Sequence, residues 1–202
     1  MCVMDAKNFE QARQYVIQRL EQELSPNLHY HGIAHTQDDV VPAVETLATM
    51  EEITGESLFL LLTAAWFHDL GFVDQALYHE LISVRYATEV LPSFGYTAEQ
   101  IEIIRWIIYA TILPQTPQTH LERIMADADL DVLGRDDFLL SNGNLRRELA
   151  FAGKDYSDAE WYAGQIKFLE GHTYFTTSAG ILRNAGQTKN IAELKKKLAE
   201  IE

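Results

Sequence analysis

Residues 58–71, LFLLLTAAWFHDLG, decide the fold. The segment is apolar nearly all round from Leu58 to Phe67, which predicts a helix over 57–70 that is buried on most sides and central to the protein. Gly71 is well suited to end that helix. The apolar run is about half of the roughly 20 residues that a membrane-spanning helix needs, so we expect a core helix and no membrane partner.

Apolar residues recur at spacings of three and four on both sides of this stretch, and no segment shows the sustained alternation of a strand. We therefore predict an all-α fold. The expected helices cover residues 8–24, 34–50, 57–70, 74–91, 98–111, 119–133, 136–152, 159–169 and 191–201. Capping boxes are expected to open three of them, at Thr97 and Gln100, Thr119 and Glu122, and Ser157 and Glu160. Pro42 predicts a bend or a late start in the second helix.

The composition is that of one acidic globular domain. The 202 residues are enough for a single domain with a sizeable core, so we expect residues 1–202 to form one. Sixteen Lys and Arg against 30 Asp and Glu give a net charge of -14. We expect no nucleic-acid polymer as a partner, because that affinity comes from clustered basic side chains. Cys2 is the single cysteine and the N-terminal residues lack the apolar stretch of a signal peptide, which favours the cytoplasm.

Two polar residues, His68 and Asp69, end the most hydrophobic helix. A buried charge needs a partner, and a metal ion is one of the few strong ones. His35 at the start of the second helix, and Asp127 among core-type residues of the sixth, complete a set of two imidazoles and two carboxylates. Such a set suits Mn, Fe, Co, Ni, Zn or Mg. Four ligands from three helices leave positions for water or substrate, as in catalytic metal sites.

The order His35, His68-Asp69, Asp127 on an all-α chain resembles the HD-domain superfamily of metal-dependent phosphohydrolases. Further segments resemble that superfamily or a bacterial branch of predicted HD phosphohydrolases: Tyr30-His31-Gly32-Ile33-Ala34-His35-Thr36, His79-Glu80-Leu81-Ile82-Ser83, and Asp127-Ala128-Asp129-Leu130 through Leu133-Gly134. The likeness covers about residues 28–135 and, more loosely, the helices up to about residue 190. It implies an HD-domain-like helical bundle with a motif core at 28–135 and extra C-terminal helices over 136–202.

The resemblance also implies the site. His35, His68, Asp69 and Asp127 become the ligands of one divalent metal ion, with Asp129 as the alternative to Asp127. The activity implied is hydrolysis of a phosphate ester, in a nucleotide or another small phosphorylated metabolite, by a metal-activated water.

Catalytic roles are implied by the same likeness. Asp69 would accept the proton of the water, and His31 would protonate the leaving oxygen, a task that suits a loop histidine. His79 would contact phosphate or a second metal, and Glu80 would position water. Arg146 is our first choice for binding the substrate phosphate, ahead of Arg85, Arg123 and Lys154.

Two other functions stay open. An HD scaffold could hold metal and nucleotide without turnover, as a regulatory module, or carry oxygen-dependent or lyase chemistry on a di-iron site. Too few histidines at the required spacing argue against the di-iron site. The sequence permits a homodimer and does not identify the substrate. Fold alone does not separate these functions.

Overall fold

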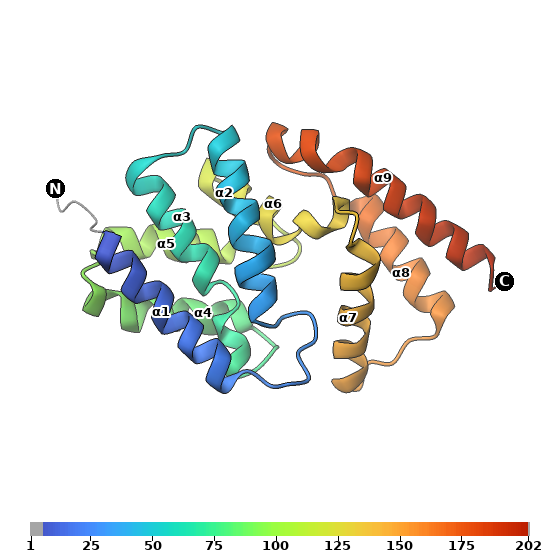
Figure 1. Cartoon of the computed structure of the whole chain (residues 1–202), viewed down its shortest axis with the longest axis horizontal. Helices are drawn as coiled ribbons and strands as arrows, with labels where there is room; N and C mark the ends of the chain where they lie inside the picture. The colour runs from blue at the N-terminus through green and yellow to red at the C-terminus, as the bar shows by residue number, and fades with distance from the viewer. Residues whose placement is uncertain (1–5, 202) are drawn as a thin grey trace. The chain divides into compact units, whose positions relative to one another are not determined.

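The structure is a computed structural model that describes residues 6–201. Cys2, on which the expectation of a cytoplasmic location partly rests, lies outside these residues. Every regular element in the described range is helical, so the prediction of an all-α fold is confirmed (Figure 1). The described chain divides into two compact units, residues 6–25 with 31–129, and residues 26–30 with 130–201. That the whole chain forms one domain stays a prediction.

The first unit holds the elements that surround the candidate site. They are α1 (Ala6–Glu23), η1 (His35–Val40), α2 (Val41–Met50), α3 (Gly55–Phe67), η2 (Leu70–Val73), α4 (His79–Val90), η3 (Leu91–Phe94), α5 (Ala98–Tyr109) and α6 (His120–Asp129). The second unit holds η4 (Asp131–Gly134), α7 (Phe138–Phe151), α8 (Asp158–Gly171) and α9 (Thr177–Ala199).

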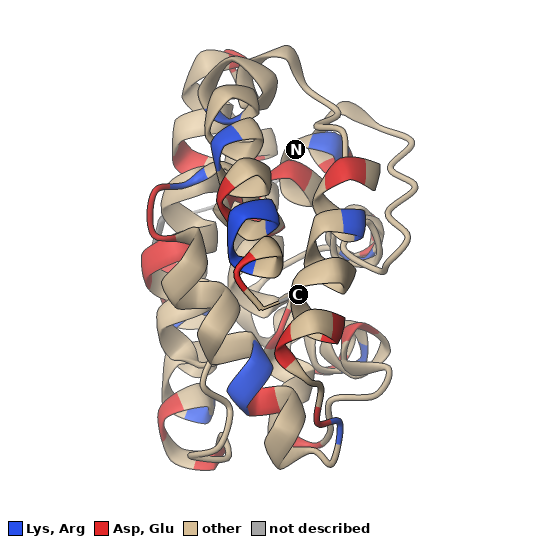
Figure 2. Ribbon diagram, turned by 90° about the vertical axis from the view of Figure 1, so that its right-hand side faces the viewer, with Lys and Arg blue, Asp and Glu red and all other residues tan. Residues whose placement is uncertain are grey.

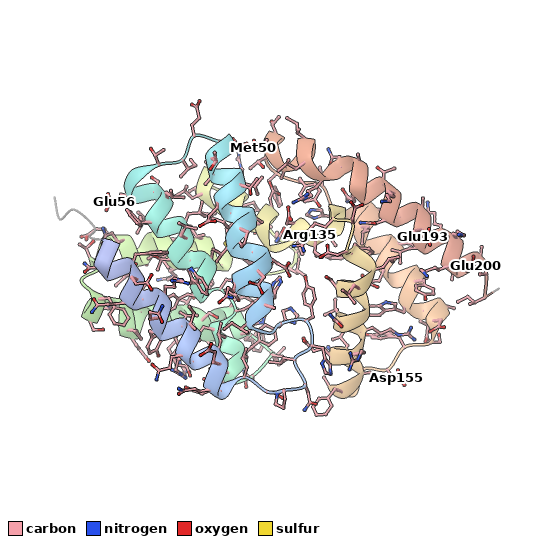
Figure 3. The ribbon with its side chains drawn as sticks, viewed as in Figure 1. Met50, Glu56, Arg135, Asp155, Glu193 and Glu200 are labelled. Carbon is pink, nitrogen blue, oxygen red and sulfur yellow. The ribbon has the colours of Figure 1, made fainter. Side chains whose placement is uncertain are left out.

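Helix α3 is the central element of the first unit, as its composition predicts. It contacts α1, α2, α4, α5 and α6, and all of its residues from Leu60 to Phe67 are buried. Residues Gly55–Val73 are long and apolar enough to cross a membrane, but 72% of this window is buried inside the protein, as in the core helix of a folded domain. Glu56 at the start of α3 (Figure 3) accepts a 2.5 Å hydrogen bond from the Gln100 amide, which ties α5 to α3.

Helix starts agree with the predicted capping residues. Capping boxes open α5 at Thr97 and α8 at Ser157. At α6 the Thr119 hydroxyl accepts the Glu122 N–H, while the Glu122 carboxylate accepts the N–H of Gln118. The second predicted helix consists of two elements, because a π-helix over His35–Val40 leads into α2, whose first turn contains Pro42. The N–H of Val41 donates to the carbonyl oxygen of Thr36 in the π-helical pattern, and Pro42 follows where the wider turn changes to the α-helix.

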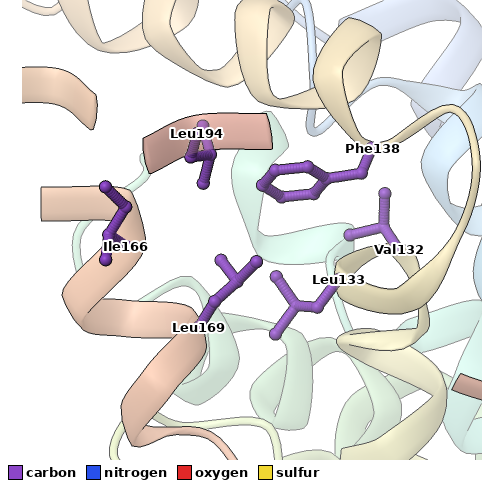
Figure 4. Packing of buried hydrophobic residues seen from close by; sticks show 6 residues of the cluster. All are labelled: Val132, Leu133, Phe138, Ile166, Leu169 and Leu194. Atoms are coloured by element: carbon purple, nitrogen blue, oxygen red, sulfur yellow. The ribbon is translucent and has the colours of Figure 1, made fainter. Parts of the chain in front are cut away.

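The second unit has its own apolar core. Six buried side chains from four helical elements meet there (Figure 4): Val132, Leu133, Phe138, Ile166, Leu169 and Leu194. Element η4 packs tightly against α9. The approach is so close that a side chain at Gly186 would collide with the carbonyl group of Gly134. Lys and Arg are interspersed with Asp and Glu along the helices (Figure 2), and Lys195 on α9 pairs with Glu170 on α8 at 2.7 Å.

Candidate metal centre

Two buried histidines and one aspartate from three separate elements converge in the first unit. His35 is the first residue of the π-helix η1, His68 comes directly after the last residue of α3, and Asp129 is the last residue of α6. The Nε2 atoms of both histidines lie 3.4 Å from Oδ1 of Asp129. One ligand atom from each of the three residues lies within 4.8 Å of the others, close enough for a shared metal ion.

Asp69 lies beside this group, and its two oxygens face three histidines. Oδ2 is 3.3 Å from Nε2 of His68 and 3.6 Å from Nε2 of His35. Oδ1 is 3.2 Å from Nε2 of His79. The structure therefore brings together three of the residues expected at the metal, His35, His68 and Asp69. Asp69 also links them to His79.

The tautomer of His68 suits a metal ligand. Its Nδ1 lies 2.8 Å from the carbonyl oxygen of Ala65, which can only accept, so Nδ1 carries the proton. In the neutral imidazole the lone pair is therefore on Nε2, which faces the group. Nε2 of His68 and Oδ2 of Asp69 are buried and make no hydrogen bond of good geometry with any described residue. Two buried acceptors facing one another fit a cation between them.

The pKa values show how negative this position is. Burial lowers the pKa of His35, but contacts with Asp129 and Asp39 and the charge of Asp69 outweigh burial and raise it to about 9. Burial likewise opposes protonation of His68, yet the two carboxylates hold its pKa well above the ordinary value. Burial raises the pKa of Asp129, but the close imidazoles of His35 and His68 outweigh burial and bring it down to about 2. The carboxylates thus favour a positive charge here, which a divalent cation would supply.

Asp127 and Asp129 occupy different places on α6. Asp127 is fully buried, as its apolar neighbours predict, but it is not one of the residues that converge with the histidines. Asp129 is one of the converging residues, and 16% of its side chain is exposed. Asp127 as the last ligand stays a prediction, and Asp129 is the carboxylate whose Oδ1 lies 3.4 Å from Nε2 of both imidazoles.

The expected acid–base residues lie around the outer side of Asp69. The His31 ring is 5.8 Å from the His35 ring, measured between centroids. His79 is held by an Nδ1 hydrogen bond of 3.0 Å to the carbonyl oxygen of Ala76, so its Nε2 faces Asp69. Glu80 Oε1 lies 3.5 Å from the same Nε2. Their catalytic roles stay predictions, and their positions are compatible with them.

Arg146 belongs to the second unit. Its guanidinium donates to Asp158 at 2.7 Å and to the carbonyl oxygen of Tyr156 at 2.6 Å, within that unit. A substrate phosphate would have to share it with these two acceptors. The role of Arg146 in substrate binding stays a prediction.

Sequence reasoning missed Asp39, which stands behind His35. The sequence placed it inside a helix of ordinary spacing, whereas it lies in the π-helix with its Oδ2 atom 3.9 Å from Nδ1 of His35. A carboxylate on the far nitrogen of a ligand imidazole makes the ligand nitrogen more basic and fixes the ring. π-Helical turns are frequent at functional sites.

We therefore expect Asp39→Asn to weaken binding of a divalent metal by about 10- to 100-fold. The side chain keeps its shape and loses its charge. Competition with a chelator of known affinity would measure the change. Asp38→Asn is the matched control, because Asp38 lies in the same π-helix but is exposed and contacts Gln37. Equal affinities of the two variants would show that Asp39 does not support His35.

A second feature missed by sequence reasoning is the tight contact between η2 and the start of α4. The N–H of Gly71 donates a 2.8 Å hydrogen bond to the hydroxyl of Ser83, which is fully buried. A side chain at Gly71 would collide with the backbone carbonyl group of His79. These two contacts fix the pair His68-Asp69 relative to the pair His79-Glu80. The glycine and the serine were present in the sequence motifs, but their pairing requires the fold.

Comparison with known proteins supports the fold and leaves the activity open. No protein-family model matches the chain, and no curated protein sequence matches it significantly. Among solved structures it matches the crystal structure of a predicted HD superfamily hydrolase from an uncultured Thermotogales bacterium. The TM-score is 0.61 at 21% sequence identity, over 96% of this chain and 92% of that chain. The chain therefore has the all-α fold of that HD superfamily structure, as its motifs predict.

Proposed function

We propose that this protein is a metal-dependent phosphohydrolase that cleaves a phosphate ester in a nucleotide or another small phosphorylated metabolite. The observation that carries the proposal is the buried convergence of His35, His68 and Asp129 with Asp69, on an HD-type fold. Nε2 of His68 and Oδ2 of Asp69 are suited to a cation rather than to a hydrogen-bond partner. The resemblance of the motifs to HD phosphohydrolases supplies the reaction class.

One divalent metal ion would be held by the four side chains that converge, which are His35, His68, Asp69 and Asp129. A bound divalent ion supplies Lewis acidity, lowering the pKa of a coordinated water from near 16 toward about 7 and polarising a phosphoryl oxygen. Neutral imidazoles and ionised carboxylates are needed for that, and the Ala65 carbonyl holds the required tautomer of His68.

The protein's own groups would then manage the protons. Asp69 would take the proton of the attacking water, and its Oδ1, 3.2 Å from His79 Nε2, would pass that proton to the imidazole. His31 would protonate the leaving oxygen, because an imidazole is a common general acid and its ring centroid lies 5.8 Å from that of His35. Glu80, next to His79, would orient water.

Metal analysis of the purified protein, combined with a hydrolysis screen, tests the proposal. We expect about one metal ion per chain by mass spectrometry of the elements. We also expect release of phosphate or product from a phosphomonoester, a phosphodiester or a nucleotide panel in the presence of Mn, Fe, Ni, Co, Zn or Mg. Chelation should abolish the activity and metal should restore it, whereas His68→Ala should be inactive throughout. If no metal supports hydrolysis of any of these substrates, the proposal is overturned. Thermal stabilisation by a nucleotide without product would favour a regulatory module.

A further inference from the structure

Phe72 is the side chain that contacts both outer histidines of the site. Its ring centroid lies 4.3 Å from that of His31, with the planes 16° apart, which is a stacked arrangement. The centroid of the His79 ring is 4.1 Å away, at 32°. The phenylalanine is 7% exposed. It is not a metal ligand and has no proton to transfer, so any contribution to the chemistry comes through the placement of these rings.

Polar contacts alone leave ring orientation weakly determined. His79 is held by a hydrogen bond at Nδ1 and by contacts of Nε2 with the carboxylates of Asp69 and Glu80, which act at the edge of its ring. Contacts at the edge do little to oppose tilting of the ring, whereas a flat apolar neighbour packed on it does. The terminal torsion of histidine is broad, so such packing decides the orientation that is populated.

Phe72 is itself fixed to the same framework. Its N–H donates a 3.0 Å hydrogen bond to the carbonyl oxygen of Asp69. The preceding Gly71 is held by Ser83 and packed directly on the His79 backbone. The aromatic ring therefore has a set position relative to Asp69 on one side and to the start of α4 on the other.

We propose that Phe72 is a positioning residue that holds the His31 and His79 imidazoles in the orientations needed for proton transfer around Asp69. Its catalytic consequence rests on the proposed function. The orientation of the two rings does not, because it belongs to the protein without substrate. The two consequences are therefore measured separately.

The first measurement is nuclear magnetic resonance of the histidine ring protons in the Zn²⁺-loaded protein. Phe72→Leu keeps an apolar side chain and removes the ring, so the His31 ring protons should lose their upfield ring-current shift, and those of His79 should move as well. Phe72→Tyr, which retains the ring, should keep both sets of shifts. Phe59→Leu is the matched control, because Phe59 packs on Phe9 in the same unit and contacts neither histidine in the described structure. Unmoved His31 and His79 shifts in Phe72→Leu would overturn the proposal.

The second measurement is steady-state kinetics with a phosphate ester found in the screen. Phe72→Leu should lower kcat by about 10- to 100-fold, because misoriented acid–base groups lose much of their effect, with KM and zinc content unchanged. Phe72→Tyr should restore kcat. Equal kcat in the wild type and Phe72→Leu, or an equal loss in Phe72→Tyr, would refute positioning by the ring. If the wild type turns over no ester, the proposed function fails, and the ring-proton shifts alone decide whether Phe72 positions the histidines.

Discussion

Asp129→Asn should lower the affinity for a divalent metal by at least about 100-fold and abolish phosphate-ester hydrolysis. The expected loss exceeds the 10- to 100-fold typical of residues that only support a ligand, because Asp129 itself contacts both imidazoles. Its Oδ1 lies 3.4 Å from Nε2 of His35 and of His68, and the amide of Asn is a much weaker metal donor than a carboxylate. Metal content after dialysis, and initial rates at saturating metal, measure the two effects.

Asp127→Asn is the matched control, two residues away on the same helix. Asp127 is fully buried, so this change should disturb its polar contacts and lower the free energy of unfolding, by about 1 to 3 kcal/mol. Metal content of the folded variant should stay at the wild-type level. The opposite pattern, with metal lost from Asp127→Asn and retained by Asp129→Asn, would restore the ligand that the sequence favoured.

The choice between these two aspartates shows where sequence reasoning stops. Apolar neighbours correctly predict that Asp127 is buried, but burial is not ligation. Successive residues of an α-helix turn by about 100°, so residues two apart point to nearly opposite sides of α6, and Asp129 is the one whose Oδ1 lies 3.4 Å from both imidazoles. Which side faces the histidines depends on how α6 packs against the rest of the unit. No spacing in one sequence contains that information.

Local patterns were more informative for the helices than for their irregular parts. The boxes at Thr97 and Ser157 place two helix starts, because a capping hydrogen bond is a local interaction. The π-helix after Ala34 has no periodicity signature of its own, so it was predicted as part of a longer helix. Asp39 was missed for the same reason, since its relation to His35 is a product of that turn.

The last helix was predicted too short. We expected it from residue 191, whereas α9 begins at Thr177, capped by Thr176. Gly180 and Gly186 lower the helix propensity of its first half and hide it from a propensity argument. Gly186 is required there by the close approach of Gly134, so tertiary packing outweighs intrinsic preference. Gly186 is therefore explained by its contact with Gly134, which the sequence alone does not reveal.

Gly71→Ala should be the most damaging single-methyl change in the first unit. The added Cβ would overlap the backbone carbonyl group of His79, which cannot rotate away as a flexible side chain can. Either η2 or the start of α4 must move, and overpacking of this kind costs about 1 to 3 kcal/mol or more. Movement of either element also separates Asp69 from His79, so we expect kcat to fall along with stability.

Denaturant unfolding of Gly71→Ala beside Gly143→Ala isolates the cause. Gly143 is exposed within α7, and a Cβ there meets no atom within 4 Å, so this control should gain about 0.5 to 1 kcal/mol from the better helix propensity of alanine. Opposite signs for the same chemical change would show that the contact with His79, not the loss of glycine, is responsible. If Gly71→Ala unfolds at the wild-type denaturant concentration and keeps its activity, then η2 and α4 are not held together as tightly as the structure indicates, and the coupling of Asp69 to His79 must have another origin.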